Sequence, residues 1–299
     1  MSVYAARARF VPVEKGFNIK RPPIEPRAFL AENERAFAAD TPTGFIPLDL
    51  SARLGTGYAA TTPLMLARYA RVRAGEALAC ALAASGEMWV VLRGKGRLRR
   101  GSDVVAWSGG DMLALPGGVA STWEADEDAV LWVTTDEPTL AFEGVRPELG
   151  VRAPIEPTLF PAEAIERQLS ALYERPMTPE TPGRAVFMAT ERTEGLGTCL
   201  PSLTLTLNAV RPGEAQRAHR HNAAAIVLSL REAKCASTID GKTFPWTQHV
   251  TLLTPAGAAH DHRNGEAEAP VTVDDIALAL IVQDGGLYYY ARTMGFAFA

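Results

Sequence analysis

Short runs of hydrophobic residues, separated by Gly, Pro and Asp, dominate the pattern along the chain. Runs of this length that end in turn-forming residues are typical of β-strands in antiparallel sandwiches and barrels. Strands are predicted at 63–72, 88–94, 96–101, 103–118, 129–135, 202–210, 224–230, 249–257 and 276–282. Helical patterns are confined to 26–39 and 161–175, each opening with a proline, which the first turn of a helix tolerates. The pattern predicts an all-β protein with a few short helices.

The predicted strands fall into two copies of one unit. The sequence VRAGE at Val72–Glu76 returns as VRPGE at Val210–Glu214, at an offset of about 140 residues, and LPGG at 115–118 returns as TPAG at 254–257. Between the copies the composition shifts towards Pro and Glu. We therefore expect an N-terminal barrel over 1–140, a Pro-rich connector with one helix over 141–183, and a C-terminal barrel over 184–299.

A pair of histidines opens the run AHRHNAAAIVLSL at 218–230 in the second copy. Side chains on a strand alternate between its faces, so His219 and His221 would point to the same side and could bind one metal ion. An isolated H-x-H is equally well explained by structural histidines. All five histidines lie in the second copy, however, at positions 219, 221, 249, 260 and 262.

The spacing in the second copy resembles the paired motifs of the cupin superfamily, G-x5-H-x-H-x3/4-E-x6-G and G-x5-P-x-G-x2-H-x3-N. Gly213 precedes His219 and His221 at the motif distance, and a later P-x-G leads to His260 and Asn264. The resemblance implies a fold of two tandem double-stranded β-helix barrels, the cupin or jelly-roll architecture.

The first copy keeps the glycines and the proline of both motifs but not the histidines. Ala81 and Ala83 stand at the H-x-H positions and Ser121 stands at the third histidine position, while Glu87 remains at the carboxylate position. The retained glycines and proline serve turn geometry and hence folding. The expected protein is a bicupin whose N-terminal barrel lacks metal ligands and whose C-terminal barrel holds the metal site.

Within the cupins, the segments RPGEAQRAHRHNAAAIVLSL and LTPAGAAHDHRNG resemble the gentisate, salicylate and 1-hydroxy-2-naphthoate dioxygenase group. That group uses Fe(II) on three histidines to cleave the ring of a hydroxylated aromatic acid with O2. The resemblance implies that His219, His221 and His260 bind the metal. Since imidazoles suit several metals, Zn, Mn or Ni are alternatives to Fe(II).

The resemblance also implies three further site residues. His262, in the HDH sequence, would be a base or a hydrogen-bond partner of the substrate hydroxyl. Asn208 would be a polar strand residue that faces the substrate. Asp275 falls near an aspartate that the group places after its second motif.

Several positions depart from the group pattern. The group usually carries iron in its first barrel, whereas here that barrel lacks histidines. The cupin glutamate is replaced by Ala225 or Ile226, Val227 stands where the group has an arginine that binds the substrate carboxylate, and Ala259 replaces an aromatic residue before the third ligand. These differences remove the specific indication of a salicylate-type substrate.

Other residues are candidates for the remaining roles. Arg184, Arg217 or Arg292 could supply a cation for an anionic substrate, although an arginine in a loop is more often solvated. His249 is interpreted as a surface turn residue and not a ligand, and Glu87 as structural.

Composition and charge exclude several classes of partner. The net charge of −4 and the lack of a basic run argue against nucleic acid. No apolar stretch long enough to span a membrane and no apolar signal segment is found, so a cytoplasmic protein is expected. The three cysteines are interpreted as buried free thiols. Because barrels of this kind associate through sheet edges and faces, we expect a homo-oligomer, either a dimer or a tetramer.

Three functions therefore remain open. The first is a mononuclear non-haem Fe(II) ring-cleaving dioxygenase that takes O2 and a small anionic, aromatic hydroxy-acid substrate. The second is a non-oxidative metal-dependent cupin enzyme, such as an isomerase, hydrolase or lyase. The third is a non-catalytic bicupin that binds a small molecule.

Overall fold

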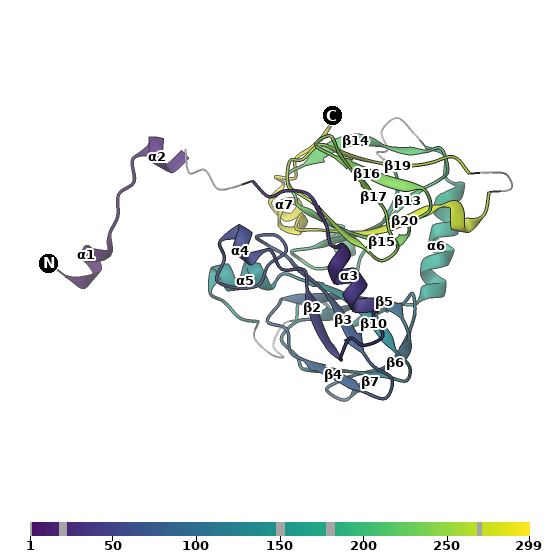
Figure 1. Cartoon of the computed structure of the whole chain (residues 1–299). Helices are drawn as coiled ribbons and strands as arrows, with labels where there is room; N and C mark the ends of the chain where they lie inside the picture. The colour runs from purple at the N-terminus through teal and green to yellow at the C-terminus, as the bar shows by residue number, and fades with distance from the viewer. Residues whose placement is uncertain (1, 18–22, 148–152, 178–182, 268–270) are drawn as a thin grey trace.

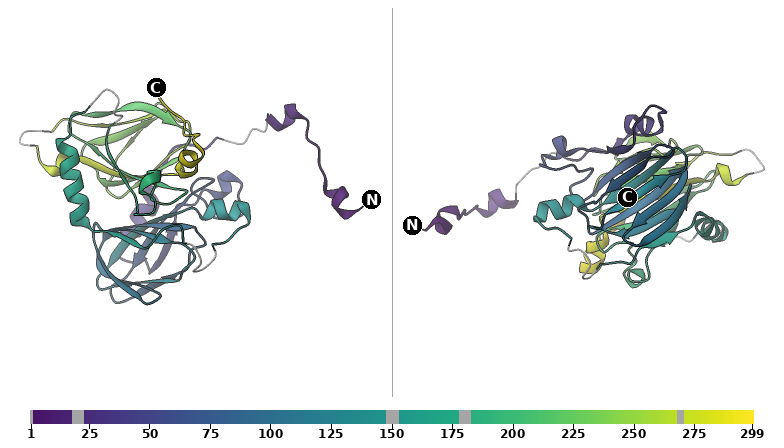
Figure 2. Two further views of the ribbon diagram at one scale, coloured as in Figure 1. Left: turned by 180° about the vertical axis from the view of Figure 1, so that it is seen from behind. Right: turned by 90° about the horizontal axis from the view of Figure 1, so that it is seen from below.

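The computed structural model describes residues 2–17, 23–147, 153–177, 183–267 and 271–299. Across these residues the strands form four antiparallel sheets, two in each half of the chain (Figure 1). The predicted all-β architecture of two tandem barrels with a few short helices is confirmed. Figure 2 shows the two barrels stacked, with the long helix α6 (Ala162–Glu174) running alongside both.

The first barrel consists of a six-stranded sheet and a four-stranded sheet. In spatial order the larger sheet contains β11 (Thr158–Phe160), β8 (Met112–Pro116), β5 (Gly86–Arg93), β10 (Ala129–Thr135), β3 (Leu66–Val72) and β2 (Gly44–Pro47). The smaller sheet contains β4 (Ala77–Cys80), β9 (Ser121–Ala125), β6 (Lys95–Arg100) and β7 (Asp103–Ser108). Buried tryptophans fill the space between them: the rings of Trp89 and Trp123 lie 4.3 Å apart, and Trp107 lies 5.9 Å from Trp123.

The second barrel repeats this plan with a six-stranded and a five-stranded sheet. The larger sheet contains β1 (Arg27–Ala28), β18 (Thr251–Thr254), β15 (Ala225–Arg231), β20 (Ala277–Gln283), β13 (Thr204–Val210) and β12 (Arg184–Met188). The smaller sheet contains β17 (Lys242–Pro245), β16 (Cys235–Ile239), β19 (His260–Asn264), β14 (Ala215–His221) and β21 (Phe296–Phe298).

The two predicted helices form, as α6 and as α3 (Leu30–Phe37). In α6 the buried residues Ile165, Leu169 and Leu172 recur at helical spacing, which explains why this segment is a helix and which face it buries. The remaining helices are α1 (Val3–Arg7), α2 (Val13–Phe17), α4 (Ser51–Leu54), α5 (Glu137–Glu143), α7 (Gly286–Ala291), η1 (Glu194–Leu196) and η2 (Val273–Asp275). Among the described residues, no helix is long and apolar enough to cross a membrane.

Two short strands cross the domain boundaries expected from the sequence. β1 lies in the segment assigned to the first barrel but pairs with β18 of the second, through Arg27 and Leu253. β11 lies in the connector but pairs with β8 of the first barrel, through Leu159 and Leu113. In both cases the strand covers a sheet edge whose backbone groups would otherwise lack partners. Residues 148–152 and 178–182 of the connector lie outside the described residues.

The large sheets of the two barrels face one another and share one hydrophobic core. A small polar cluster is buried within it: the indole nitrogen of Trp132 donates a 3.0 Å hydrogen bond to the Thr251 hydroxyl, and the Tyr69 hydroxyl lies 3.1 Å from the same oxygen. The Tyr69 hydroxyl also donates to the carbonyl oxygen of His249. Because buried polar groups are costly unless they are paired, these bonds fix how the barrels dock.

His249 is a turn residue but not a surface one, which corrects part of the sequence interpretation. Its φ of 64° lies in the left-handed region, as expected in a tight turn. The imidazole is half-buried, however, and stacks on Phe37 with ring centroids 5.1 Å apart. Burial, together with the positive charge of Arg93, lowers the pKa of His249 to about 4.

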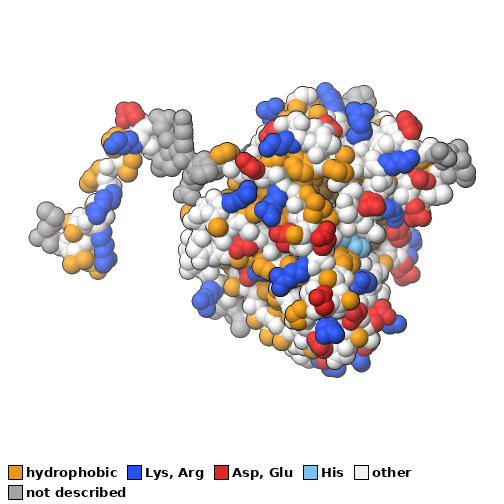
Figure 3. Space-filling view, viewed as in Figure 1, with side chains coloured by type: hydrophobic (Ala, Val, Ile, Leu, Met, Phe, Trp, Pro, Cys, Tyr) orange, Lys and Arg blue, Asp and Glu red, His pale blue; other side chains and the backbone are white. Residues whose placement is uncertain are grey.

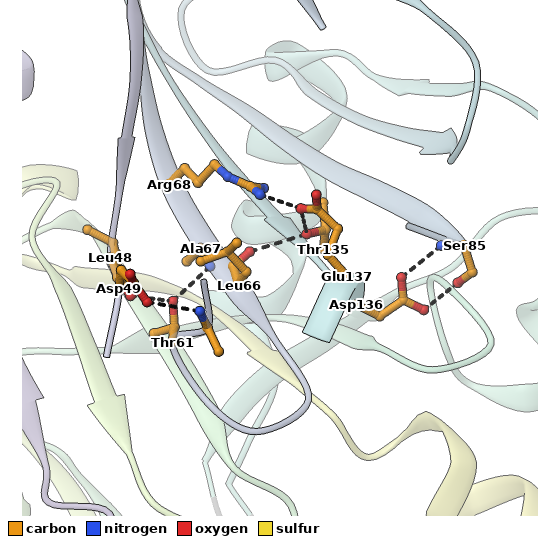
Figure 4. A network of polar contacts seen from close by, with 11 residues as sticks. Leu48, Asp49, Thr61, Leu66, Ala67, Arg68, Ser85, Thr135, Asp136 and Glu137 are labelled. Atoms are coloured by element: carbon orange, nitrogen blue, oxygen red, sulfur yellow. Dashed lines mark hydrogen bonds and ion pairs between the residues drawn. The ribbon is translucent and has the colours of Figure 1, made fainter. Parts of the chain in front are cut away.

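The same type of aspartate closes a loop in each barrel. In the first barrel the amide of Ser85 donates to Asp136 at 2.8 Å (Figure 4), and the hydroxyl of Ser202 from the second barrel donates to the same carboxylate. In the second barrel the amide of Ala224 donates to Asp284 at 2.8 Å. Asp136 directly follows β10 and Asp284 directly follows β20, the strands at equivalent places in their sheets. The duplication therefore extends to loops that the sequence motifs did not cover.

The three cysteines are free, as predicted, although Cys80 is only half-buried. Burial raises the pKa of all three thiols to about 12. Lysine and arginine are interspersed with aspartate and glutamate over the face shown in Figure 3.

Replacing Thr251 with Val tests the polar cluster between the barrels. The substitution keeps the shape of the side chain but leaves the Trp132 indole nitrogen without its acceptor, so the free energy of unfolding should fall by about 1–3 kcal/mol. Urea denaturation measures it. Thr243→Val, at an exposed position of β17, is the matched control and should change stability by less than about 0.5 kcal/mol. Equal effects of the two substitutions would refute the structural role of the cluster.

Replacing His249 with Asn tests the burial of the imidazole. The folded-state pKa of about 4 lies below the ordinary value of 6.5, so the folded state binds its proton less readily than the unfolded chain. The corresponding stability is fully present above pH 6.5 and is lost as the pH falls towards 4. Over this window the wild type should therefore lose up to about 3 kcal/mol more stability than the His249→Asn variant.

Asparagine suits this comparison because it tolerates the left-handed backbone and does not titrate. Chemical denaturation at a series of pH values gives the two stability curves. Parallel curves for the wild type and the variant would show that the imidazole is solvated.

Candidate metal centre

The register between β14 and β19 brings three histidines together. His219 on β14 lies directly opposite His260 on β19, and His221 follows two residues later on the same face of β14. All three are about 5% exposed. One candidate ligand atom from each lies within 4.8 Å of the others, so the geometry is that of a group that could hold one metal ion.

Hydrogen bonds hold each of these imidazoles in the tautomer that leaves Nε2 free to bind a metal. Nδ1 of His219 lies 2.8 Å from the carbonyl of Arg217, Nδ1 of His221 lies 2.7 Å from that of Ala223, and Nδ1 of His260 lies 3.0 Å from that of Ala258. A carbonyl can only accept, so each Nδ1 carries the proton and each Nε2 presents a lone pair. This outer support of ligand histidines is typical of protein metal sites.

Burial also keeps the three imidazoles neutral. Desolvation lowers the pKa of His219 and His221, and it lowers the pKa of His260 to about 4, with further lowering from the neighbouring histidines. Neutral imidazole is the form that binds a metal ion. The donor set, its tautomers and its protonation state therefore all fit a divalent transition metal.

His262 lies in the same interior, with its ring centroid 6.0 Å from that of His260. The indole nitrogen of Trp246 donates to the hydroxyl of Ser237, and this hydroxyl lies 2.7 Å from Nδ1 of His262. Among the described residues, Nδ1 of His262 is the acceptor within reach of the Ser237 hydroxyl proton. The hydroxyl therefore donates to Nδ1, and the imidazole proton of His262 lies on Nε2. Complete burial lowers the pKa of His262 to about 3.

Asn208 is buried on β13, and its side-chain amide donates to Gln216 at 3.3 Å. Gln216 pairs with His262 across β14 and β19, so Asn208 reaches the neighbourhood of His262. The side-chain oxygen of Asn208 is buried and, among the described residues, has no hydrogen-bond partner. The structure thus brings Asn208 to the interior of the second barrel, with one acceptor available.

The side chain of Asp275 forms a local cap, and the site role expected for this residue stays a prediction. Its carboxylate accepts hydrogen bonds of 2.8 Å from the amide and the hydroxyl of Thr272, forming a capping box on η2. Its backbone carbonyl accepts from Asn264 at the end of β19. Asp275 therefore anchors the loop that follows β19.

The side chains of the three candidate arginines form their described contacts with groups other than the histidine side chains. Arg184 forms an ion pair with Glu214 at 3.0 Å and donates to carbonyl groups at the end of α6. The guanidinium of Arg217 lies 3.7 Å from the ring centre of Phe298. Arg292 is exposed at the end of α7. Their predicted substrate-binding role therefore has no support in the structure.

Sequence reasoning missed two residues that touch the histidine triad. The side-chain nitrogen of Gln283, on β20, lies 3.1 Å from Nε2 of His221. The ring of Phe296, on the C-terminal strand β21, stacks on His219 with centroids 5.2 Å apart. An alignment of the two halves on Asp136 and Asp284 would have matched Gln283 with Thr135, which lies opposite Glu87 at the carboxylate position of the motif. Nothing in the local pattern indicated that β21 pairs with β14.

The first barrel holds a buried arginine where the second has its triad. Arg100, 6% exposed, donates a 2.7 Å hydrogen bond to the hydroxyl of Ser121, the residue at the third histidine position. The guanidinium also lies 3.8 Å from Glu87, whose carboxylate accepts from the indole nitrogen of Trp89. Burial raises the pKa of Glu87 to about 7. This arrangement agrees with a structural role for Glu87.

No family model matches the chain. Over 81 residues, 27% of the chain, it is 31% identical to a 1-hydroxy-2-naphthoate 1,2-dioxygenase from Nocardioides sp., and the match spans 21% of that relative's length. Among solved structures it is similar to salicylate 1,2-dioxygenase from Pseudaminobacter salicylatoxidans, with a TM-score of 0.73 and 16% identity over 100% of this chain and 93% of that one.

A structure of the same enzyme with gentisate gives a TM-score of 0.74 at 14% identity, covering 96% of this chain and 90% of that one. A cupin 2 conserved barrel domain protein from Leptotrichia buccalis gives 0.53 at 13% identity, covering 88% and 98%. At such identities the likeness concerns the fold. The chain is therefore a bicupin in architecture, built from two tandem cupin barrels like those of salicylate 1,2-dioxygenase.

Proposed function

We propose that the second barrel binds one Fe(II) ion through His219, His221 and His260, and that the protein is a ring-cleaving dioxygenase of the gentisate dioxygenase type. The observation that carries the proposal is the set of three buried, neutral imidazoles whose Nδ1 atoms are all held by backbone carbonyls. The partial identity to a naphthoate dioxygenase and the shared bicupin fold support the reaction class.

The bound metal would supply a site at which an oxygen-donating substrate and O2 meet. The three imidazoles are neutral, so they leave the positive charge of the ion uncompensated, which favours an anionic substrate such as a phenolate or a carboxylate. The burial of the triad excludes bulk water from this position. The residues around the ion would thus favour a negatively charged substrate and limit the access of bulk water.

Two residues are proposed to orient the substrate. His262 has its proton on Nε2, as a result of the bond from Ser237 to Nδ1, so it acts as a hydrogen-bond donor to a substrate oxygen. Its low pKa argues against the alternative role of a base near neutral pH. Asn208 offers its unpartnered side-chain oxygen as an acceptor for a substrate hydroxyl. Val227 belongs to the apolar core of this barrel and would present an apolar wall.

A non-oxidative metal enzyme is the second candidate, in which Zn, Mn or Ni acts as a Lewis acid on the same triad. The observation that favours it is Val227, since an apolar side chain replaces the arginine that the dioxygenase group uses for the carboxylate. Consumption of O2 separates the two candidates. The cytoplasmic location and the homo-oligomeric state remain predictions.

Metal analysis tests the site itself. Purified wild-type protein, reconstituted anaerobically with Fe(II), should bind one ion per chain, and His260→Ala should weaken binding by more than about 100-fold because it removes a ligand. Elemental analysis after removal of free metal gives the stoichiometry. His249→Asn is the matched control, since His249 lies in the barrel interface, and it should retain the metal. Equal metal content in wild type and His260→Ala would refute the site.

An oxygen electrode tests the reaction. Iron-loaded wild-type protein is offered gentisate, salicylates and hydroxynaphthoates, and we expect O2 uptake with at least one of them, accompanied by loss of the aromatic absorption. His219→Ala should abolish the uptake because the metal is lost. Absence of uptake across the panel, with one iron bound per chain, would rule out the aromatic assignment while leaving the metal site intact.

A further inference from the structure

We infer that Gln283 is a fourth protein ligand of this metal, and that its side-chain oxygen replaces the glutamate of the cupin motif from a neighbouring strand. The inference rests on the metal site proposed above. It concerns a residue of β20 that neither the histidine spacing nor the family motifs include.

The first step is the contact with His221. The side-chain nitrogen of Gln283 lies 3.1 Å from Nε2 of His221, while Nδ1 of His221 is bound to the carbonyl of Ala223. Nε2 is therefore the atom with the lone pair, and it is the atom that would bind a metal. The carboxamide of Gln283 thus lies directly beside the position of the ion.

The distance fits two ligands of the same ion. Nitrogen and oxygen ligands lie about 2.1 Å from a transition metal, so two neighbouring ligands at a right angle are roughly 3.0 Å apart. Without a metal, the amide nitrogen of Gln283 donates to the lone pair of His221. With the metal bound that lone pair is used, and a half-turn of the carboxamide presents Oε1 instead of Nε2.

The second step is the register of the central strands. Ala225, at the position of the missing glutamate, lies directly opposite Gln283 on β20. In the first barrel, Glu87 occupies the same motif position and lies directly opposite Thr135 on β10. In the first barrel the long polar side chain of this pair is therefore on β5, as Glu87. In the second barrel it is on the opposite strand, β20, as Gln283. The small side chain of Ala225 leaves room for Gln283.

The flanking residues of the same row are polar and lack partners. Thr204 pairs with Gln283 on one side, and Thr254 pairs with Ala225 on the other. Both hydroxyl groups are fully buried, and within the described part of the chain neither forms a hydrogen bond. Buried hydroxyls of this kind call for water or ligand oxygens. We therefore expect water or ligand oxygen atoms to bind on the side of the triad where Gln283 lies.

A carboxamide ligand has a chemical consequence that a glutamate would not have. Three imidazoles and one amide are all neutral, so the shell keeps the full charge of the ion and its preference for an anionic substrate. Four protein ligands leave two positions of a six-coordinate ion. The site would then accept one chelating anion, or one single-atom donor together with O2.

Cobalt titration tests the inference in the full-length protein. Wild type, Gln283→Ala and Gln283→Leu are titrated with Co(II) against a competing chelator, and the visible spectrum of each complex is recorded. Leucine approximates the volume of glutamine but has no donor atom. We expect the dissociation constant to rise about 10- to 100-fold in both variants, with a changed spectrum, and Gln283→Glu to restore or exceed wild-type affinity. Gln248→Leu, the same change at an exposed turn position, is the control and should match wild type.

The outcomes separate this inference from the proposed function. If wild type binds no cobalt, the metal centre fails and Gln283 with it. If wild type binds cobalt and the Ala and Leu variants match it in affinity and spectrum, only the role of Gln283 is refuted. A crystal structure of the cobalt-loaded wild type decides independently: Oε1 within about 2.2 Å of the ion supports the inference, and an oxygen beyond bonding distance overturns it.

Discussion

The pairing of β14 with β19 is the constraint on which the candidate site depends. Side chains alternate along each strand, so one register sends His219, His221 and His260 into the barrel together. A slip of one residue would turn an entire set of imidazoles to the opposite face. The backbone carbonyls that hold each Nδ1 lie two residues from the histidine in every case, so the local backbone also determines the tautomers. Burial then lowers the pKa values of the three imidazoles and keeps the triad neutral.

The two barrels share one architecture but fill their interiors with different side chains. A large β-barrel interior must be filled, because empty space forfeits packing and unpaired polar groups are costly. The first barrel fills it with stacked tryptophans and places Arg100 beside Glu87 and Ser121. The second keeps small residues such as Ala225 and surrounds them with imidazole, amide and hydroxyl groups. Among the described residues, both barrels retain buried polar atoms without a hydrogen-bond partner, such as the indole nitrogens of Trp107 and Trp123 in the first and the hydroxyls of Thr204 and Thr254 in the second.

The first barrel nevertheless contributes to the second. The large sheets share a core, and the hydroxyl of Thr251 in the second barrel accepts a hydrogen bond from Trp132 and donates one to the Tyr69 hydroxyl, both in the first barrel. Thr251 begins β18, whose other end carries Thr254 in the row beside Gln283. The short strand β1, from the N-terminal part of the chain, also covers an edge of the second barrel's large sheet. The barrel with the histidine triad is therefore held against a packed neighbour that lacks the histidines.

Sequence by itself determined the duplicated all-β architecture, the lack of histidines in the first barrel and the identity of the three candidate ligands, because strand periodicity and motif spacing are local properties of the chain. It did not reveal that Asp275 caps a loop, that Arg184 is paired with Glu214, or that His249 is half-buried against Phe37. It also missed Gln283 and Phe296. The cap of Asp275 is a local contact with Thr272, whereas the other features depend on which segments the tertiary structure brings together. Periodicity tells which face of a strand a residue occupies, but only the tertiary register decides what lies opposite that face.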